Sequence, residues 1–260
     1  MDHVVALPRR HKIPYGPAPS QYGHLYLPQP SAQRAPLVVL VHGGSWSTKY
    51  ALVVYSAVAR DLASRGAVVW NLEYRRLEEG GGWPVSCDDV VAGIEAIDGP
   101  VAEKLAVLGQ RVDRAAVTVI GHSAGGHLAV WAVARLGAAT DASTVTTVVS
   151  QSGVLDLTVP GARDKESVVT LMGVPYEQDP QRYVAASPTH APVVDALVVA
   201  QHTLDDESVP IRVSRDYVAG AGARGQRAEL VELPGDHAAF LDISSPAHHD
   251  TVRILGLGAS

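Results

Sequence analysis

The stretch VTVIGHSAGGH, Val117–His127, decides the fold. Its first four residues form a mainly apolar, β-branched run that is typical of a buried strand, and a helical pattern, Gly126–Leu136, follows almost at once. Between the two lies the pentapeptide GHSAG, which matches G-x-S-x-G with Ser123 at its centre. In this motif the chain turns so sharply that the residues two before and two after the serine must be nearly free of side chain. The stretch therefore predicts a strand–turn–helix unit with Ser123 as a nucleophile, the alternative being a serine that only packs the turn.

Strands and helices alternate along the rest of the chain. Leu37–Val41 (LVVLV) is a continuous apolar run, as expected of a strand buried on both faces of a parallel sheet. The other predicted strands are His11–Tyr15, His24–Leu27, Ala67–Leu72, Val117–Ile120, Val145–Ser150, Ala196–Ala200 and Ala228–Leu233. The predicted helices are Tyr50–Arg65, Pro84 to about Gly109 with a break at Gly99-Pro100, Gly126–Leu136, and Pro210 to about Gly220. This alternation predicts an α/β fold with a mostly parallel, doubly wound sheet and helices on both faces.

Two stretches interrupt the alternation, Arg75–Trp83 and Gly153–Pro192. Long insertions between the elements of such a sheet usually cover the functional site. A chain of 260 residues, 47% of them hydrophobic, suits one large domain better than two small ones. We therefore expect a single α/β domain over residues 1–260, with lid-like insertions at about 75–83 and 153–192.

A serine hydroxyl needs a base within hydrogen-bond reach and a carboxylate that orients the base. In a parallel sheet these partners follow the serine at the carboxyl ends of later strands, first the acid and then the histidine. The loop after Ala196–Ala200 contains Asp205 and Asp206, and the loop after Ala228–Leu233 contains His237. The order and the placement predict a catalytic triad of Ser123, an aspartate and His237.

Asp206 is favoured as the acid, because it lies four residues before Pro210, where the next helix is predicted to begin. Asp205 is the second choice, and either residue could instead be a solvated loop acid or a helix cap. Among the other histidines, His248 and His249 lie in a helical tail and are interpreted as surface residues. His122 lies inside the turn and cannot easily reach back to Ser123.

The negative oxygen that forms on serine attack needs preorganised backbone N–H donors. One donor is predicted at Ala124, directly after the nucleophile. The other is predicted in the loop HGGSW that follows Leu37–Val41, at Gly44 and Ser45, with Gly43 as an alternative. Four residues in loops near the expected site are candidates for an acyl or aryl pocket, core or lid packing being the alternative for each: Trp46, Trp83, Met172 and Tyr183.

Composition and charge limit the classes of partner that the protein is expected to bind. The net charge is −6 without a long basic run, so neither nucleic acid nor an anionic membrane is expected to bind. No His/Cys/Asp cluster has metal-ligand spacing, and we expect no metal and no cofactor. The start of the chain lacks the pattern of a secretion signal, and the single cysteine, Cys87, fits a reducing compartment. These features predict a cytoplasmic protein, with its state as a monomer or homodimer left open.

Four motifs together resemble the α/β-hydrolase superfamily: HGGSW, GHSAGGHLA, DDESVP and PGDH. They look like the esterase branch that includes hormone-sensitive-lipase-like carboxylesterases and kynurenine formamidases. The resemblance runs from about Leu25 to the last helix. HGGSW is closer to the formamidase pattern HGG-x-W than to HGGG, whereas Ala238 stands where those formamidases usually carry an aromatic residue.

The motifs and the resemblance predict a serine hydrolase that cleaves a small carboxylic ester through an acyl-enzyme, with a small-molecule ester or amide as its partner. An arylformamidase acting on N-formylkynurenine or a similar aryl formamide is the sharpest alternative. Acyl transfer or cyclisation uses the same residues and differs only in what intercepts the acyl group. A non-catalytic ligand-binding protein on the same fold is the remaining class.

Overall fold

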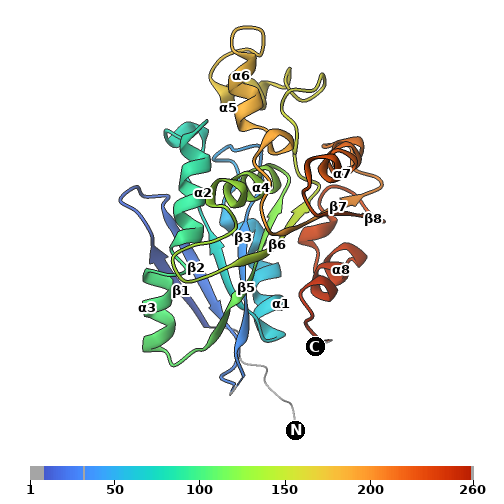
Figure 1. The fold of residues 1–260 in the computed structure, drawn as a ribbon. Helices are drawn as coiled ribbons and strands as arrows, with labels where there is room; N and C mark the ends of the chain where they lie inside the picture. The colour runs from blue at the N-terminus through green and yellow to red at the C-terminus, as the bar shows by residue number, and fades with distance from the viewer. Residues whose placement is uncertain (1–8, 32, 259–260) are drawn as a thin grey trace.

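The fold is built on a mixed, mostly parallel sheet (Figure 1). The computed structural model describes residues 9–31 and 33–258. In this part of the chain eight strands pair in the order β1-β2-β4-β3-β5-β6-β7-β8. Their bounds are Arg9–Pro14, Tyr22–Leu27, Ala35–Val41, Val68–Leu72, Val112–His122, Val145–Gln151, Leu197–Thr203 and Ala228–Leu233, for β1 to β8 in chain order. β1 and β2 run antiparallel to their neighbours, and the other six strands are parallel. The predicted α/β fold class is confirmed.

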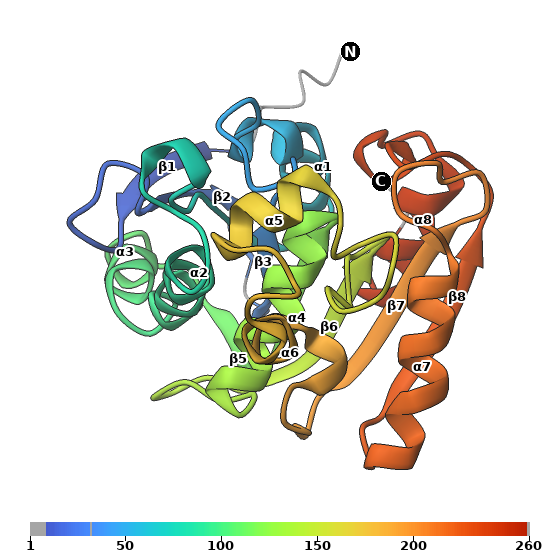
Figure 2. The same ribbon diagram turned by 90° about the horizontal axis from the view of Figure 1, so that it is seen from above.

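Helices cover both faces of this sheet (Figures 1 and 2). The α-helices α1 to α8 span Ser56–Ser64, Val85–Glu95, Pro100–Val107, Ala124–Leu136, Glu166–Met172, Pro180–Ala186, Arg212–Arg224 and Pro246–Ile254. The short 3₁₀ turns η1 to η4 span Leu52–Tyr55, Leu77–Glu79, Pro188–His190 and Ala239–Leu241. No helix in the described ranges is long and apolar enough to cross a bilayer.

The side chains of β3 alternate between two hydrophobic cores. Val38 and Leu40 pack with α1, whereas Leu37, Val39 and Val41 pack in the larger core with α2, α3 and α4. This is the period-two alternation of a strand with both faces covered. Because β3 is so completely buried, the loop that follows it is held in a fixed place beside the serine turn.

The element bounds differ from the predictions where the sequence is polar. β5 begins at Val112 rather than Val117, because its first half carries polar and exposed residues that break the apolar run. β7 continues through Gln201, His202 and Thr203, which are buried although they are polar. α7 continues to Arg224 and ends at Gly225, which has a φ of 81°. Polar residues inside a strand are visible only once their buried partners are known.

Two helices of the 153–192 segment, α5 and α6, lie beyond the carboxyl end of the parallel strands (Figure 1), and both lie over the sheet when it is seen from above (Figure 2). Two side chains of α4 fasten this segment. The ring Nε2 of His127 lies 2.8 Å from the carbonyl oxygen of Ala186, and the indole N–H of Trp131 donates to the carbonyl of Ala185 at 2.9 Å. We call the segment from 153 to 192 the cap.

His248 lies in the helical tail, as predicted, but the prediction that it is a surface residue is wrong. Its side chain is fully buried, and its Nε2 lies 2.7 Å from Oδ2 of Asp61 on α1. Asp61 also accepts a hydrogen bond from Arg65 on the same helix. The pair pins α8 to α1, and the amphipathic pattern of α8 placed His248 on its inner face.

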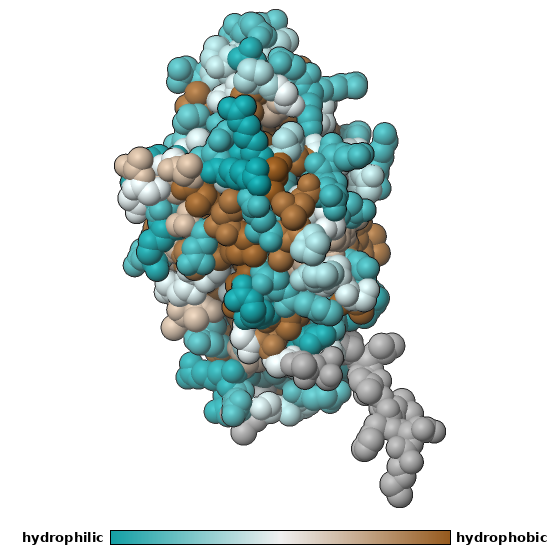
Figure 3. Space-filling model, turned by 90° about the vertical axis from the view of Figure 1, so that its right-hand side faces the viewer, coloured by the Kyte–Doolittle hydropathy of each residue, from teal (hydrophilic) through white to brown (hydrophobic). Residues whose placement is uncertain are grey.

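The side of the molecule that carries α7 and α8 has hydrophobic residues gathered at mid-height, with hydrophilic residues above, below and between them (Figure 3). This side also carries β8, the last strand of the sheet, none of whose residues is fully buried. Leu204, in the loop that follows β7, has 54% of its surface exposed.

The buried ring of His127 makes the free energy of unfolding depend on pH. Burial lowers its pKa to about 4, whereas an unfolded chain titrates near 6.5. Between these two pKa values the unfolded state binds more protons than the folded state. The free energy of unfolding is therefore highest above pH ~6.5 and decreases as the pH drops towards 4. We expect His127→Gln, which keeps a donor for Ala186, to remove one proton from this dependence, about 1.4 kcal/mol per pH unit. Urea unfolding between pH 4.5 and 6.5 measures the two slopes, and parallel curves for the two proteins would contradict the expectation.

Candidate active site

Ser123 occupies a strained turn between β5 and α4. Its φ is 55° and its ψ is −119°, a left-handed conformation that costs a residue with a side chain about 1–3 kcal/mol. A Cβ at Gly121 would collide with the backbone of Gly125, and a Cβ at Gly125 would collide with the carbonyl of Val41 on β3. The two motif glycines are therefore required by close packing of backbone on backbone. The turn presents Ser123 to a cavity that His237 also lines.

His237 is paired with Asp206 and not with Asp205. The ring Nδ1 of His237 lies 2.7 Å from Oδ2 of Asp206, whose side chain is fully buried. The other carboxylate oxygen of Asp206 accepts backbone N–H groups from Ser208 and Val209, each at 2.8 Å. Asp205 is exposed, and its own N–H donates to the carbonyl of Gly235. The structure thus brings together the favoured aspartate and the predicted histidine.

The electrostatics of Asp206 fix the tautomer of His237. Burial alone would raise the pKa of Asp206, but hydrogen bonds from His237, the Val209 N–H and Ser152 outweigh burial and lower this pKa well below its usual range. Asp206 is therefore a carboxylate at neutral pH, and Nδ1 of His237 must donate to it. In the neutral ring, the Nε2 of His237 then carries no proton, as a general base requires.

His122, next to the serine, holds the backbone of His237. Its Nε2 lies 2.7 Å from the carbonyl oxygen of His237, and the two ring centroids are 4.6 Å apart. Burial, together with the positive charge that His237 carries when it is protonated, lowers the pKa of His122 to about 4, so the His122 ring stays neutral. The sequence analysis considered His122 only as a partner of Ser123 and did not predict this contact with His237. The position of His122 in the serine turn is the only feature of the sequence that points to the contact.

The loop after β3 lies directly against Ser123. A Cβ at Gly43 would be 2.5 Å from the carbonyl oxygen of His122 and 3.1 Å from Cβ of Ser123. Gly44 has a φ of 115°, which only glycine adopts without strain, and the side chain of Tyr50 fills the space beside it. Ser45 also has a positive φ, at 52°. The predicted donors from this loop line the same cavity as Ser123 and His237.

Ala124 completes the predicted set of donors. As the first residue of α4 it has an N–H group that no earlier turn of the helix can accept. Ala124 lines the cavity beside Ser123. The partial positive charge of the helix N-terminus favours a negative oxygen at this place.

The cavity has a volume of about 740 Å³. Most of its wall is apolar, supplied by η1, the cap, α7, η4 and the loop before α7: Val54, Val154, Val159, Pro160, Ala162, Val168, Val209, Pro210, Val213 and Leu241. Charged residues stand on the cap and on α7, and Nζ of Lys165 on the cap donates to the carbonyl of Ser208 at 2.8 Å. The cap therefore reaches the loop that carries Asp206.

Of the four predicted pocket residues, the structure places only Trp46 in the cavity wall. The ring of Trp83 packs edge-on against Trp131, with centroids 4.9 Å apart. Met172 and Tyr183 are fully buried in the larger core, and the hydroxyl of Tyr183 donates to the carbonyl of Val174. The pocket prediction is wrong for these three residues, because Met172 and Tyr183 lie within the larger core and Trp83 packs against it on Trp131 of α4.

Residues 75–83, predicted to be a lid-like insertion, supply no residue to the cavity wall. Instead, Arg76 donates to the carbonyl of Tyr50 at 2.6 Å, and Glu78 accepts from the hydroxyl of Ser47 and the N–H of Thr48. These contacts hold the loop after β3 on the side away from the cavity.

In residues 9–31 and 33–258, no group of three or more His, Cys, Asp or Glu side chains is arranged to hold a metal ion.

The sequence model of the BD-FAE family matches residues 24–219 of this chain. This range includes the loop after β3, the serine turn and Asp206, and ends before His237.

Curated relatives are esterases by name. The chain is 32% identical over 120 residues to a probable isoprenylcysteine alpha-carbonyl methylesterase, ICMEL1, of Arabidopsis thaliana, a match that covers 46% of this chain and 24% of the relative. It is 31% identical over 125 residues to a probable methylesterase of the same kind, ICME, of Oryza sativa subsp. japonica, covering 46% and 27%. The matched region thus spans about a quarter of the length of these relatives.

Solved structures share the fold. A truncated carbohydrate esterase from gut microbiota superposes with a TM-score of 0.80 at 19% identity, covering 96% of this chain and 95% of the other. Esterase B of Lactobacillus rhamnosis gives 0.77 at 17% identity, covering 98% and 87%. The esterase Est2 of Thermogutta terrifontis gives 0.71 at 21% identity, covering 95% and 90%. At these identities the likeness concerns the fold alone.

Proposed function

We propose, from the premise that this chain belongs to the BD-FAE family of α/β-hydrolase esterases, that it hydrolyses small carboxylic esters through an acyl-enzyme formed on Ser123. The observation that carries this proposal is the 2.7 Å pair of Asp206 and His237, which shares one cavity with the strained serine turn.

The chemistry follows from the geometry. His237 Nε2 takes the proton of the Ser123 hydroxyl as the oxygen attacks the ester carbonyl, and Asp206 stabilises the imidazolium that forms. The N–H groups of Ala124 and of Gly44 or Ser45 hold the oxyanion. His237 then returns its proton to the leaving alcohol. Water, activated by the same histidine, releases the acid and restores Ser123.

The cavity supports an ester with an acyl or alcohol part larger than formyl. A volume of about 740 Å³ falls in the ordinary range of small-molecule sites, and the wall beside Ser123 is largely apolar. Two of the structural neighbours hold short acyl groups by name: Est2 of T. terrifontis with butyrate bound, and esterase B of L. rhamnosis inhibited by a tributyrin phosphonate. We therefore propose short aliphatic esters as the first substrates to test.

A panel of p-nitrophenyl esters, from acetate to octanoate, compared with N-formylkynurenine, tests the substrate class. We expect acetate and butyrate esters to be hydrolysed, because the cavity has room for more than a formyl group. Turnover of N-formylkynurenine with a kcat/KM equal to or above that of the esters would instead identify an arylformamidase. An added alcohol or amine that diverts the acyl group from water would identify acyl transfer.

Labelling by a fluorophosphonate separates the enzyme from a ligand-binding protein of the same fold. An esterase with this geometry is expected to be labelled at Ser123 and to lose its activity in proportion. A protein that is neither labelled nor inhibited would be a ligand-binding protein.

We further propose that the chain forms a single α/β-hydrolase domain that works in the cytoplasm. The one cysteine, Cys87, is buried and free, which supports a reducing compartment.

A further inference from the structure

We propose that Glu73, acting through His42, is a positioning residue that orients the peptide between Gly43 and Gly44 so that its N–H faces the oxyanion. Glu73 follows the end of β4 and belongs to none of the motifs used to predict the site. The inference deepens the proposed esterase function and rests on it.

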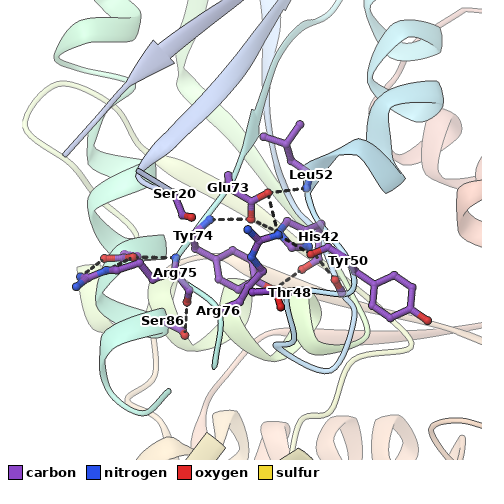
Figure 4. A network of polar contacts seen from close by, with 12 residues as sticks. Ser20, His42, Thr48, Tyr50, Leu52, Glu73, Tyr74, Arg75, Arg76 and Ser86 are labelled. Carbon is purple, nitrogen blue, oxygen red and sulfur yellow. Dashed lines mark hydrogen bonds and ion pairs between the residues drawn. The ribbon is translucent and has the colours of Figure 1, made fainter. Parts of the chain in front are cut away.

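The ring of His42 connects Glu73 to the loop (Figure 4). Its Nδ1 lies 2.7 Å from the carbonyl oxygen of Gly43, and its Nε2 lies 2.6 Å from Oε1 of Glu73. Both side chains are buried, with exposures of 0% and 1%. The ring also stacks on Tyr74 with centroids 4.5 Å apart, and the hydroxyl of Tyr74 donates to the carbonyl of His42. The ring is therefore held on both edges and on one face.

The direction of these hydrogen bonds follows from the partners. The carbonyl of Gly43 can only accept, so Nδ1 of His42 must carry a proton. Glu73 accepts from the N–H of Leu52 at 2.9 Å and from the N–H of Tyr74 at 3.1 Å, which marks it as a carboxylate. Nε2 of His42 then donates to it. Both ring nitrogens carry protons, and the pair is a buried ion pair.

The ionised state of Glu73 has further support. Burial would raise its pKa, but the bonds from His42 and from the Leu52 N–H, together with the charge of Arg76, lower it. The guanidinium of Arg76 lies 3.5 Å from Oε2 of Glu73. Arg76 also holds the carbonyl of Tyr50, the residue that packs against Gly44. The loop is thus held from two directions by one charge cluster.

The geometry of a trans peptide carries the effect to the site. The C=O of Gly43 and the N–H of Gly44 belong to one rigid plane and point in opposite directions. Because His42 holds the carbonyl on the buried side, the N–H of Gly44 is turned to the side where Ser123 lies. Without that hydrogen bond the glycine-rich peptide is free to rotate, and the predicted donor is lost from the oxyanion hole.

Two variants, assayed for hydrolysis of a chromogenic butyrate ester, test the inference. Glu73→Gln keeps the shape of the side chain and removes its charge, and His42→Phe in the Glu73→Gln background keeps the stacking on Tyr74 but removes the bond to Gly43. We expect kcat to fall about tenfold in the first protein and about a hundredfold in the second, of the order seen when one oxyanion donor is lost. KM should stay within about twofold, because the ground-state ester does not need the donor.

A trifluoromethyl ketone provides the readout that loss of stability alone does not change. It binds as a tetrahedral oxyanion on the serine, so its affinity should fall by the same factor as kcat. The ¹⁵N chemical shifts of the His42 ring should show two protonated nitrogens in the wild type and one in Glu73→Gln. Full kcat and full ketone affinity in both variants would overturn the inference.

A second buried pair serves as the matched control. His248 and Asp61 lie 2.7 Å apart, and they link α8 to α1 away from the cavity wall. His248→Phe with Asp61→Asn should lower the melting temperature while kcat and ketone affinity stay at the wild-type values. If the wild type hydrolyses no ester at all, the proposed function fails. If the wild type hydrolyses the ester but the Glu73 and His42 variants keep wild-type kcat and ketone affinity, as the control does, only the positioning role fails.

Discussion

Replacement of Ser123 by alanine is expected to lower kcat for a short-chain ester at least ten-thousandfold, while the protein stays folded. The hydroxyl is the proposed nucleophile, and no acyl-enzyme can form without it. Stability should rise slightly or stay level, because alanine at a φ of 55° is no more strained than serine. Steady-state hydrolysis of p-nitrophenyl butyrate and labelling by a fluorophosphonate measure the effect.

Ser150 offers the matched control for this substitution. It lies on β6, the strand beside β5, it is fully buried, and its hydroxyl has no hydrogen-bond partner among the residues that the structure describes. Ser150→Ala should keep wild-type activity and labelling. A Ser123→Ala protein that turns over ester at the wild-type rate would refute the proposed nucleophile, and equal losses in both variants would indicate a general effect on folding.

Asp206→Asn should lower kcat about ten-thousandfold with little change in KM. An asparagine side chain can donate to Nδ1 of His237, which moves the ring proton to Nε2 and removes the base from Ser123. The backbone donors of Ser208 and Val209 can still be satisfied by the amide oxygen, so the loop should keep its shape. The dependence of kcat on pH in both proteins, followed with the same ester, provides the measurement.

Asp205→Asn tests the alternative acid directly. Asp205 precedes Asp206 in the same loop but is exposed to solvent. We expect this variant to retain at least half of the wild-type kcat. Loss of activity in Asp205→Asn together with normal activity in Asp206→Asn would reverse the assignment of the acid.

Much of the fold could be predicted because its signals are local. The apolar run of β3 and the glycines around Ser123 state their structure within a few residues. The contacts that hold the site are long-range, and no pattern announces them. Glu73 and His42 are 31 residues apart, and His122 and the carbonyl of His237 are 115 apart. Such pairs become visible only when the sheet places their strands together.

The aromatic residues show a different limit. Trp46 and Trp83 both lie in loops near the site, and nothing in the sequence separates them. Trp46 lines the cavity, whereas Trp83 packs on Trp131 of α4. Which of two surfaces an apolar side chain joins is decided by the path of the cap over α4, and this path depends on contacts across the whole segment.

The attachment of the cap to α4 has an evolutionary consequence. His127 and Trp131 bind the main-chain carbonyls of Ala186 and Ala185, and neither hydrogen bond uses a side chain of α6. Mutations that alter the side chains of the cap while preserving its backbone would leave these two anchors in place. Substrate preference can therefore diverge among descendants of this chain by drift in the cap, while the catalytic scaffold beneath it is inherited unchanged.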